Sequence, residues 1–160
     1  DSTVSLAKLS ATGTKNSTTF LRGDNTFAAP AGGSLVKLAA TTVSSNVANV
    51  DFTSAFTSTY SVYKIIIQGA RPDTDNAMSS QSSATETSTN MDLTIYNMLD
   101  SAKNTYVTCI GGFEGADDEF RTLLGSFNYN QTNTRDSVRF FNTSGNNIAT
   151  GTFTVYGVVT

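Results

Sequence analysis

The sequence contains no histidine, no tryptophan and a single cysteine, Cys109. Histidine is the side chain best suited to proton transfer near neutral pH and is the commonest metal ligand. Its absence excludes Ser-His and Cys-His catalytic groups and imidazole zinc sites. A single cysteine cannot form a disulfide within the chain. Because no general base or cationic residue lies near it in the sequence, we interpret Cys109 as a buried small hydrophobic residue and not as a nucleophile.

Charged residues are also scarce. They make up 14% of the 160 residues, and the net charge is −3, whereas an average soluble domain is roughly 25% charged. An acidic chain without a basic patch is not expected to bind nucleic acid. The longest apolar run, 65–67 with its neighbours, is far shorter than the roughly 20 residues of a membrane-spanning helix. We therefore expect no membrane insertion.

The residues that are abundant favour β-structure. Thr, Ser and Asn replace the missing charged residues, and strong helix formers are few, with three Glu and five Lys. Thr and the aromatic residues suit pleated, half-buried surfaces, whereas Ser, Asn and Gly suit turns. From residue 35 onward, runs with alternating apolar residues are separated by regularly spaced turn signals. The sequence therefore predicts an all-β, jelly-roll-like antiparallel β-sandwich. The predicted strands are 35–43, 47–52, 60–70, 91–99, 106–113, 120–129, 136–141 and 151–160.

The most apolar of these strands is 60–70. Alternation places Tyr63, Ile65 and Ile67 on one face and Val62 and Ile66 on the other. A strand that is apolar on both faces is a central strand covered on both sides, and in a two-layer sandwich the second cover could come from another subunit. In the last strand, the residues expected to face inward are Phe153, Val155 and Val159.

The first 33 residues follow a different pattern. Residues 1–10 space their apolar side chains for either a short helix or an extended strand, and neither would be stable alone at this length. The opening also starts in mid-pattern without Met. This start predicts the C-terminal part of a longer or processed polypeptide, although a simple boundary with nothing structured upstream is the alternative.

The stretch 11–31 is too polar for a core strand and too interrupted for a helix. Its apolar side chains are nevertheless too large for a plain flexible linker, so we interpret it as a neck that needs a partner. The breaker cluster 30–34 predicts a boundary between a stalk end and neck, 1–33, and a head domain, 34–160.

Arg22, Gly23 and Asp24 spell the tripeptide that cell-adhesion ligands use. That function requires an exposed loop tip, whereas here the tripeptide stands between Leu21 and Phe27. We therefore interpret it as a turn within the neck, a position that Asp and Asn favour.

Two polar stretches of the head are candidate binding loops. The first, 73–90, is low in complexity and predicts a long surface loop, and loops of this length are usually functional or mobile. The second, 114–119, is an acidic cluster that lacks the D-x-D-x-D-G order of a calcium loop. We favour a solvated turn there and predict no metal site.

Several segments resemble tailed-bacteriophage fibre proteins. The run 11–30, ATGTKNSTTFLRGDNTFAAP, is similar to a segment that recurs where the fibrous part of such proteins ends, and 4–9, VSLAKL, is similar to units of their stalks. The segments that resemble their terminal β domain are 50–53 (VDFT), 60–67 (YSVYKIII), 71–76 (RPDTDN) and 151–158 (GTFTVYGV).

This resemblance implies a parallel homotrimer without enzymatic activity or cofactor, located on the virion after synthesis in the bacterial host cytoplasm. In a trimer, the apolar side chains of the stalk and neck could share one axial core, where each large side chain contributes roughly 1.5–3 kcal/mol on burial. The residues expected to make these trimer contacts are Val4, Leu6, Leu9, Phe20, Leu21 and Phe27.

The function implied by the resemblance is that of a tail-fibre terminal domain, which binds a host-surface glycan or protein and is joined to an upstream fibre or virion protein. A capsid-attached fibre or decoration protein is the alternative. A glycosidase is disfavoured, because the carboxylates at 117–119 lie in a small domain without tryptophan. The candidate receptor-binding residues are Asp73, Asp75, Asn76, Tyr96, Glu114, Asp117 and Asp118. Tyr96, Tyr106 and Tyr129 are candidate stacking platforms, although ordinary sheet packing is the more common role of such tyrosines.

Overall fold

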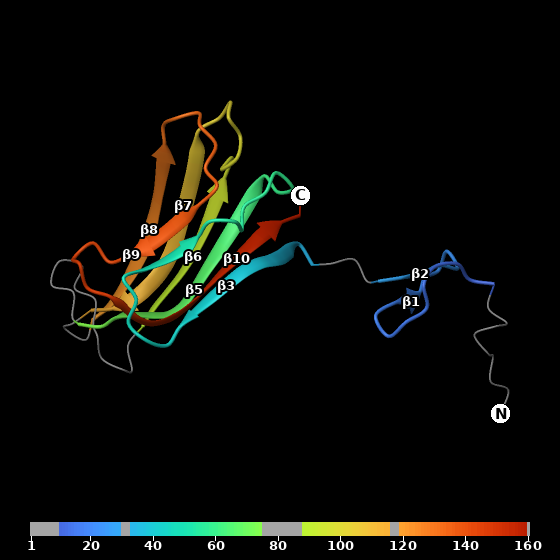
Figure 1. The fold of residues 1–160 in the computed structure, drawn as a ribbon, viewed down its shortest axis with the longest axis horizontal. Coiled ribbons are helices and arrows are strands. Elements are labelled where there is room, and N and C mark those ends of the chain that lie inside the picture. Colours follow the sequence, from blue (N-terminus) through green and yellow to red (C-terminus); the bar gives the residue numbers. More distant parts are fainter. Residues whose placement is uncertain (1–9, 30–32, 75–87, 116–118, 160) are drawn as a thin grey trace. The chain divides into compact units, whose positions relative to one another are not determined.

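The computed structural model describes residues 10–29, 33–74, 88–115 and 119–159. The chain divides into two compact units, Asp1–Gly33 and Ser34–Thr160. The described residues form strands and turns and contain no helix (Figure 1), which confirms the all-β prediction. Among them there is accordingly no helix that is long and apolar enough to cross a membrane.

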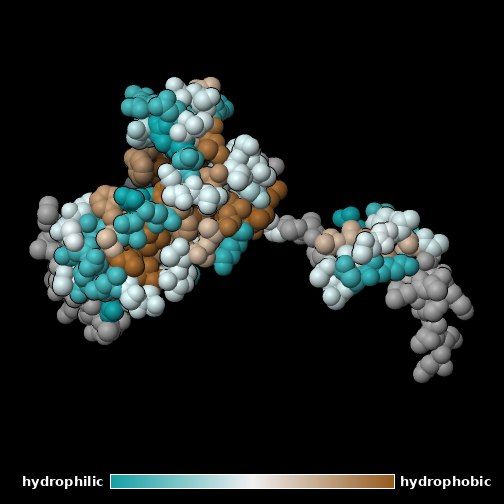
Figure 2. Space-filling view, in the orientation of Figure 1, coloured by the Kyte–Doolittle hydropathy of each residue, from teal (hydrophilic) through white to brown (hydrophobic). Residues whose placement is uncertain are grey.

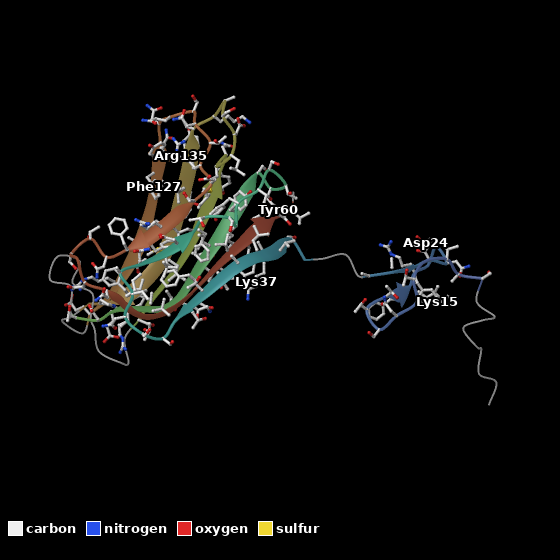
Figure 3. The ribbon with its side chains drawn as sticks, in the orientation of Figure 1. Lys15, Asp24, Lys37, Tyr60, Phe127 and Arg135 are labelled. Atoms are coloured by element: carbon white, nitrogen blue, oxygen red, sulfur yellow. The ribbon has the colours of Figure 1, made fainter. Side chains whose placement is uncertain are left out.

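The first unit contains a small β-hairpin. Strand β1 (Phe20–Leu21) pairs antiparallel with β2 (Phe27–Ala28). Thr12 lies alongside this hairpin, because its backbone oxygen accepts a hydrogen bond from the Phe27 nitrogen at 2.7 Å. Lys15 Nζ lies 5.6 Å from the centre of the Phe27 ring (Figure 3). These contacts order the described part of the neck.

The Arg-Gly-Asp tripeptide occupies the turn of this hairpin. The Asn25 nitrogen donates to the Arg22 oxygen at 3.0 Å, and Asn25 takes a φ of 62°. Asp24 Oδ1 accepts hydrogen bonds from the Thr26 nitrogen and hydroxyl at 3.1 and 2.6 Å, and the hydroxyl contact is the main cause that lowers the Asp24 pKa. The turn prediction is confirmed. The tripeptide is nevertheless exposed at the hairpin tip, contrary to the expectation that its apolar neighbours would hide it.

The second unit, the head, contains eight strands among its described residues. Their bounds are β3 (Leu35–Val43), β4 (Asn49–Phe52), β5 (Val62–Pro72), β6 (Thr89–Tyr96), β7 (Thr105–Glu114), β8 (Phe120–Tyr129), β9 (Val138–Phe141) and β10 (Ile148–Val158). Six of them form an antiparallel sheet in the order β3-β10-β5-β6-β7-β8, and β4 pairs with β9 in a second, two-stranded sheet. The predicted strands 35–43 and 120–129 match their observed bounds, and the others differ by a few residues at their ends.

The core lies between the two sheets and follows the predicted alternation. Tyr63 and Ile65 of β5 and Val155 of β10 are completely buried. Val155 stands opposite Ile65 in the register of β10 and β5. From the second sheet, Val50 and Phe52 contribute buried side chains to the same cluster. β5 has a neighbouring strand on each side, which confirms that it is a central strand.

The two layers of the head are unequal, because the second sheet has two strands and the first has six. A jelly roll distributes eight strands over two sheets, so this head is consistent with a β-sandwich in which the second layer covers only part of the first. At the edge strand β8, Phe120, Leu124 and Phe127 remain 75%, 79% and 60% exposed. The view in Figure 2 shows hydrophobic residues at the surface in the middle of the head, with hydrophilic patches toward its ends.

The C-terminal strand ends against an aromatic side chain. A Cβ atom placed on Gly157 would lie 2.5 Å from two ring carbons of Tyr60, and the Tyr60 ring in turn packs edge-on against Tyr63. Figure 3 shows Tyr60 near the end of β10. Val159 follows β10 and is 55% exposed, so the expectation that it faces inward is wrong because the strand ends one residue earlier.

The packing at Gly157 leads to a stability prediction. We expect Gly157→Ala to lower the free energy of unfolding by roughly 1–3 kcal/mol, because the added methyl group overlaps the ring of Tyr60 and forces it to move. Gly125→Ala is the matched control, since a Cβ atom there meets nothing within 4 Å. Thermal denaturation of both variants measures the difference. Equal midpoints for the two variants would contradict the packing described here.

Candidate functional site

The head has two distinct ends. Ser34, where the chain enters the head, accepts a hydrogen bond from the Val159 nitrogen at 2.9 Å, and we call this the entry end. At the opposite end, Val43 of β3 pairs with Gly151, β5 pairs with the start of β6 through Ala70 and Thr89, and the end of β7 pairs with the start of β8. We call this the far end. It lies at the lower left of the head in Figure 1.

The two predicted binding loops both leave the sheet at the far end. One joins β5 to β6 and the other joins β7 to β8, and in an antiparallel sheet these alternate connections lie at the same end. The connection from β3 to β4 and the turn 142–147 lie there as well, since Val47 bridges to Ile148. Four connections therefore leave the sheets at the end opposite to Ser34.

Asp73, which follows β5, forms hydrogen bonds with residues of two other far-end connections. Its Oδ1 accepts a hydrogen bond from the Asn147 nitrogen at 3.0 Å, and its Oδ2 accepts from Asn147 Nδ2 at 2.8 Å and from Asn46 Nδ2 at 3.2 Å. Its backbone nitrogen also donates to the Asn147 oxygen at 3.1 Å. The structure thus places this predicted binding residue in a network internal to the protein, where it positions the far-end turns.

A charged pair holds the second sheet together on the same side of the molecule. Arg139 of β9 donates from Nε to Asp51 Oδ1 at 2.7 Å and from Nη2 to Asp51 Oδ2 at 2.8 Å. The hydrogen bonds from Arg139 are the main cause that holds the pKa of Asp51 below its ordinary value, and Asn49 adds to the effect. This two-pronged geometry fixes the register of β4 against β9.

A cavity of about 340 Å³ opens at the far end between β9 and the ends of β5 and β10. Its inner wall is apolar and includes Ile67 and Phe153, which belong to the core. Its rim is mixed, with Arg71 from β5, Phe141 from β9 and polar residues of the turn that follows β9. Cavities of this size are within the range that binds small molecules.

The remaining predicted site residues divide between the two ends. Tyr96 lies in strand β6 and not in a loop, and it stands opposite Tyr106 of β7 near the entry end, where the two rings are 39% and 47% exposed. Tyr129 packs against Arg135, whose guanidinium carbon lies 4.1 Å from the ring centre, and remains 47% exposed. Glu114 lies at the far end and pairs in register with Phe120. Asp75, Asn76, Asp117 and Asp118 lie outside the described residues.

The predicted trimer contacts that the structure describes belong to the neck hairpin. Phe20 and Leu21 are 62% and 45% exposed, and Phe27 is partly covered. Within its own unit the hairpin therefore leaves two large apolar side chains exposed to water. Val4, Leu6 and Leu9 lie outside the described residues.

The described residues contain no set of three or more His, Cys, Asp or Glu side chains arranged to hold a metal ion. Cys109 is half-buried and packs against the core. Burial, and then the charge of Asp92, raise the pKa of its thiol, which is the opposite of what a nucleophile requires.

Arg71, Arg139 and Phe141 were not identified as binding residues from the sequence. Arg139 finds its partner Asp51 at a separation of 88 positions, and no local pattern marks such a pair. Arg71 stands in a turn-like segment beside a proline, where its side chain gives no periodic signal. Only the packing of the β4–β9 sheet against the end of β5 and the start of β10 brings these residues to one cavity.

The network at Asp73 leads to a second stability prediction. We expect Asp73→Ala to lower the free energy of unfolding by about 1–3 kcal/mol, because a part-buried amide of Asn147 loses its charged acceptor. Asn46→Ala removes only the exposed bond of the same network and should have a smaller effect. Chemical denaturation compares the two variants, and an equal loss in both would contradict the structural role of Asp73.

Comparison with known proteins yields no match. No family model matches the sequence, no curated protein matches it, and no solved structure matches the fold. A proposal for the function therefore depends on the residues and geometry described above.

Proposed function

We propose that this chain is the terminal part of a bacteriophage tail fibre and that its head binds a receptor, glycan or protein, on the host cell surface. The observation that carries the proposal is the arrangement of the head. The connections between β5 and β6 and between β7 and β8 leave the sheet at the far end, whereas the chain enters at Ser34 at the opposite end. A receptor-binding head requires such an arrangement, because its loops must point away from its attachment.

We further propose that the protein acts as a parallel homotrimer joined to an upstream fibre or virion protein. Exposed apolar side chains support this assembly. In addition to Phe20 and Leu21 of the neck, Ile110 and Leu124 stand opposite each other on β7 and β8 and are 57% and 79% exposed. Monomeric proteins rarely expose contiguous apolar patches larger than a few hundred Å², so contact with further copies of the chain would cover this surface.

The proposed role is binding without catalysis. The chain has no histidine. At the far end, the carboxylate of Asp73 is already occupied by hydrogen bonds to Asn147. The far end instead provides a cavity with an apolar inner wall and a mixed rim, which suits recognition. In a trimer, three weak sites would act together and raise the overall avidity by up to about 10²–10⁴, provided that all can engage at once.

Adsorption tests the receptor-binding role. We expect the purified full chain to compete with the virion that carries it and to slow adsorption of that virion to its host cells, whereas heat-denatured chain should not compete. Immunogold labelling of the same virion should mark the tail. An adsorption rate that is unchanged at saturating chain would refute the proposal, and label on the capsid would favour the capsid-attached fibre instead.

Light scattering tests the assembly. We expect the full chain to have three times its monomer mass of 16.9 kDa. Replacing both Phe20 and Leu21 by Ser should shift the mass toward the monomer, because each large apolar side chain contributes roughly 1.5–3 kcal/mol on burial. Arg22→Ser, at an exposed polar position of the same hairpin, is the control and should leave the mass unchanged. A full chain that is monomeric at all concentrations would exclude the trimer.

A further inference from the structure

The far-end cavity is lined by Arg71, a cation for which the described residues provide no ion pair. The Nε atom of Arg71 has less than 1 Å² of exposed surface and no hydrogen-bond partner among the residues that the structure describes. Two described carboxylates in this part of the fold have other partners, because Asp51 binds Arg139 and Asp73 binds Asn46 and Asn147. A buried donor without an acceptor destabilises a fold, and native proteins rarely keep one without a reason.

The charges around Arg71 indicate which kind of hydrogen-bond acceptor a ligand would have to offer. Arg71 lines the cavity together with Arg139, whose charge is paired with Asp51, so among the described lining residues Arg71 is the cation without an ion pair. A guanidinium group binds the planar or tetrahedral oxygens of a carboxylate or phosphate through two hydrogen bonds. The matching ligand therefore carries an oxyanion.

The other walls indicate what the oxyanion is attached to. Phe140 and Phe153 pack together with ring centres 5.4 Å apart and form an apolar wall. Phe141 lines the cavity and is 59% exposed, whereas the preceding residue, Phe140, is partly buried and packs against the core. An exposed aromatic ring beside an apolar wall suits the C–H face of a sugar ring, and amide side chains on the rim suit its hydroxyl groups.

We propose that this cavity binds an acidic sugar, a monosaccharide unit bearing a carboxylate or a phosphate, with Arg71 as the anion ligand and Phe141 as the platform for the ring. The assignment rests on the proposed function in one respect only, in that the sugar would belong to a host-surface glycan. Binding of the sugar itself is independent of the host. The cavity volume of about 340 Å³ accommodates one sugar unit, not a long oligosaccharide.

Titration calorimetry on the full chain tests the site with D-glucuronate, D-glucose 6-phosphate, D-glucose and inorganic phosphate as probes. We expect the two acidic sugars to bind with a Kd that rises with salt, and to bind more tightly than glucose or phosphate alone. Arg71→Gln should weaken binding of both acidic sugars by about tenfold or more. Lys37→Gln makes the same change of charge near the entry end and should have no effect.

Two further measurements distinguish an effect on ligand binding at the cavity from an effect on folding. Arg71→Gln should leave the melting temperature unchanged or raise it, since the side chain has no partner to lose, and Phe141→Ala should weaken the acidic sugars without changing the binding of inorganic phosphate. Glucuronate binding alone would assign a carboxylate, and glucose 6-phosphate binding alone would assign a phosphate. Equal binding of acidic sugars to wild type and Arg71→Gln would overturn the site, as would phosphate binding as tightly as glucose 6-phosphate.

Adsorption to host cells is measured in parallel. If wild type and Arg71→Gln compete equally with the virion, the receptor-binding role stands and the assignment of the acidic sugar to the host-surface glycan fails. If the acidic sugars bind but wild type never competes for adsorption, the site stands and the proposed function fails. The two proposals can therefore fail separately.

Discussion

The head depends on the insertion of its last strand, β10, between its first and its third. β10 pairs antiparallel with β3 on one side and with β5 on the other, and its Val155 completes the fully buried centre of the core together with Tyr63 and Ile65. Without β10, β3 would have no neighbour in the six-stranded sheet. These pairings join residues at least 76 positions apart, so they close late and cooperatively in any folding route that begins with local contacts.

The division of the head strands into a six-stranded and a two-stranded sheet explains which part of the head is buried and which part is exposed. β4 and β9 cover the centre of the large sheet with Val50 and Phe52, but β8 lies at the free edge and most of its side chains are exposed. Natural proteins usually protect such an edge with charges, proline or a covering segment. β8 contains one charged residue, Arg121, and this weak protection is understandable if other copies of the chain cover the edge.

The candidate site could be predicted in part. That the loops after β5 and β7 would lie at one end follows from the alternation of antiparallel strands, and the sequence located both loops. The role of Asp73 could not be predicted, because its partner Asn147 is 74 positions away. The same applies to Arg71, whose Nε atom has no hydrogen-bond partner among the described residues, and a missing contact leaves no mark in a sequence. Tyr96 was expected to bind a receptor although it stands in the predicted strand 91–99, and only the register of β6 with β7 shows that it lies near the entry end, opposite Tyr106.

The sequence by itself determined the class of structure. Its abundance of Thr, Ser and aromatic residues, and the period of two in segments such as β3 and β5, were sufficient for an all-β head with Tyr63, Ile65 and Phe153 inside, because side-chain alternation is a local property of the strand. The lack of histidine likewise excluded Ser-His and Cys-His catalytic groups and imidazole zinc sites without reference to the fold. Only the tertiary structure decided how the strands divide between the sheets, which of them forms the open edge, and that Arg71, Arg139 and Phe141 share one cavity. Those outcomes depend on pairing between distant strands, and local periodicity does not specify which strands pair.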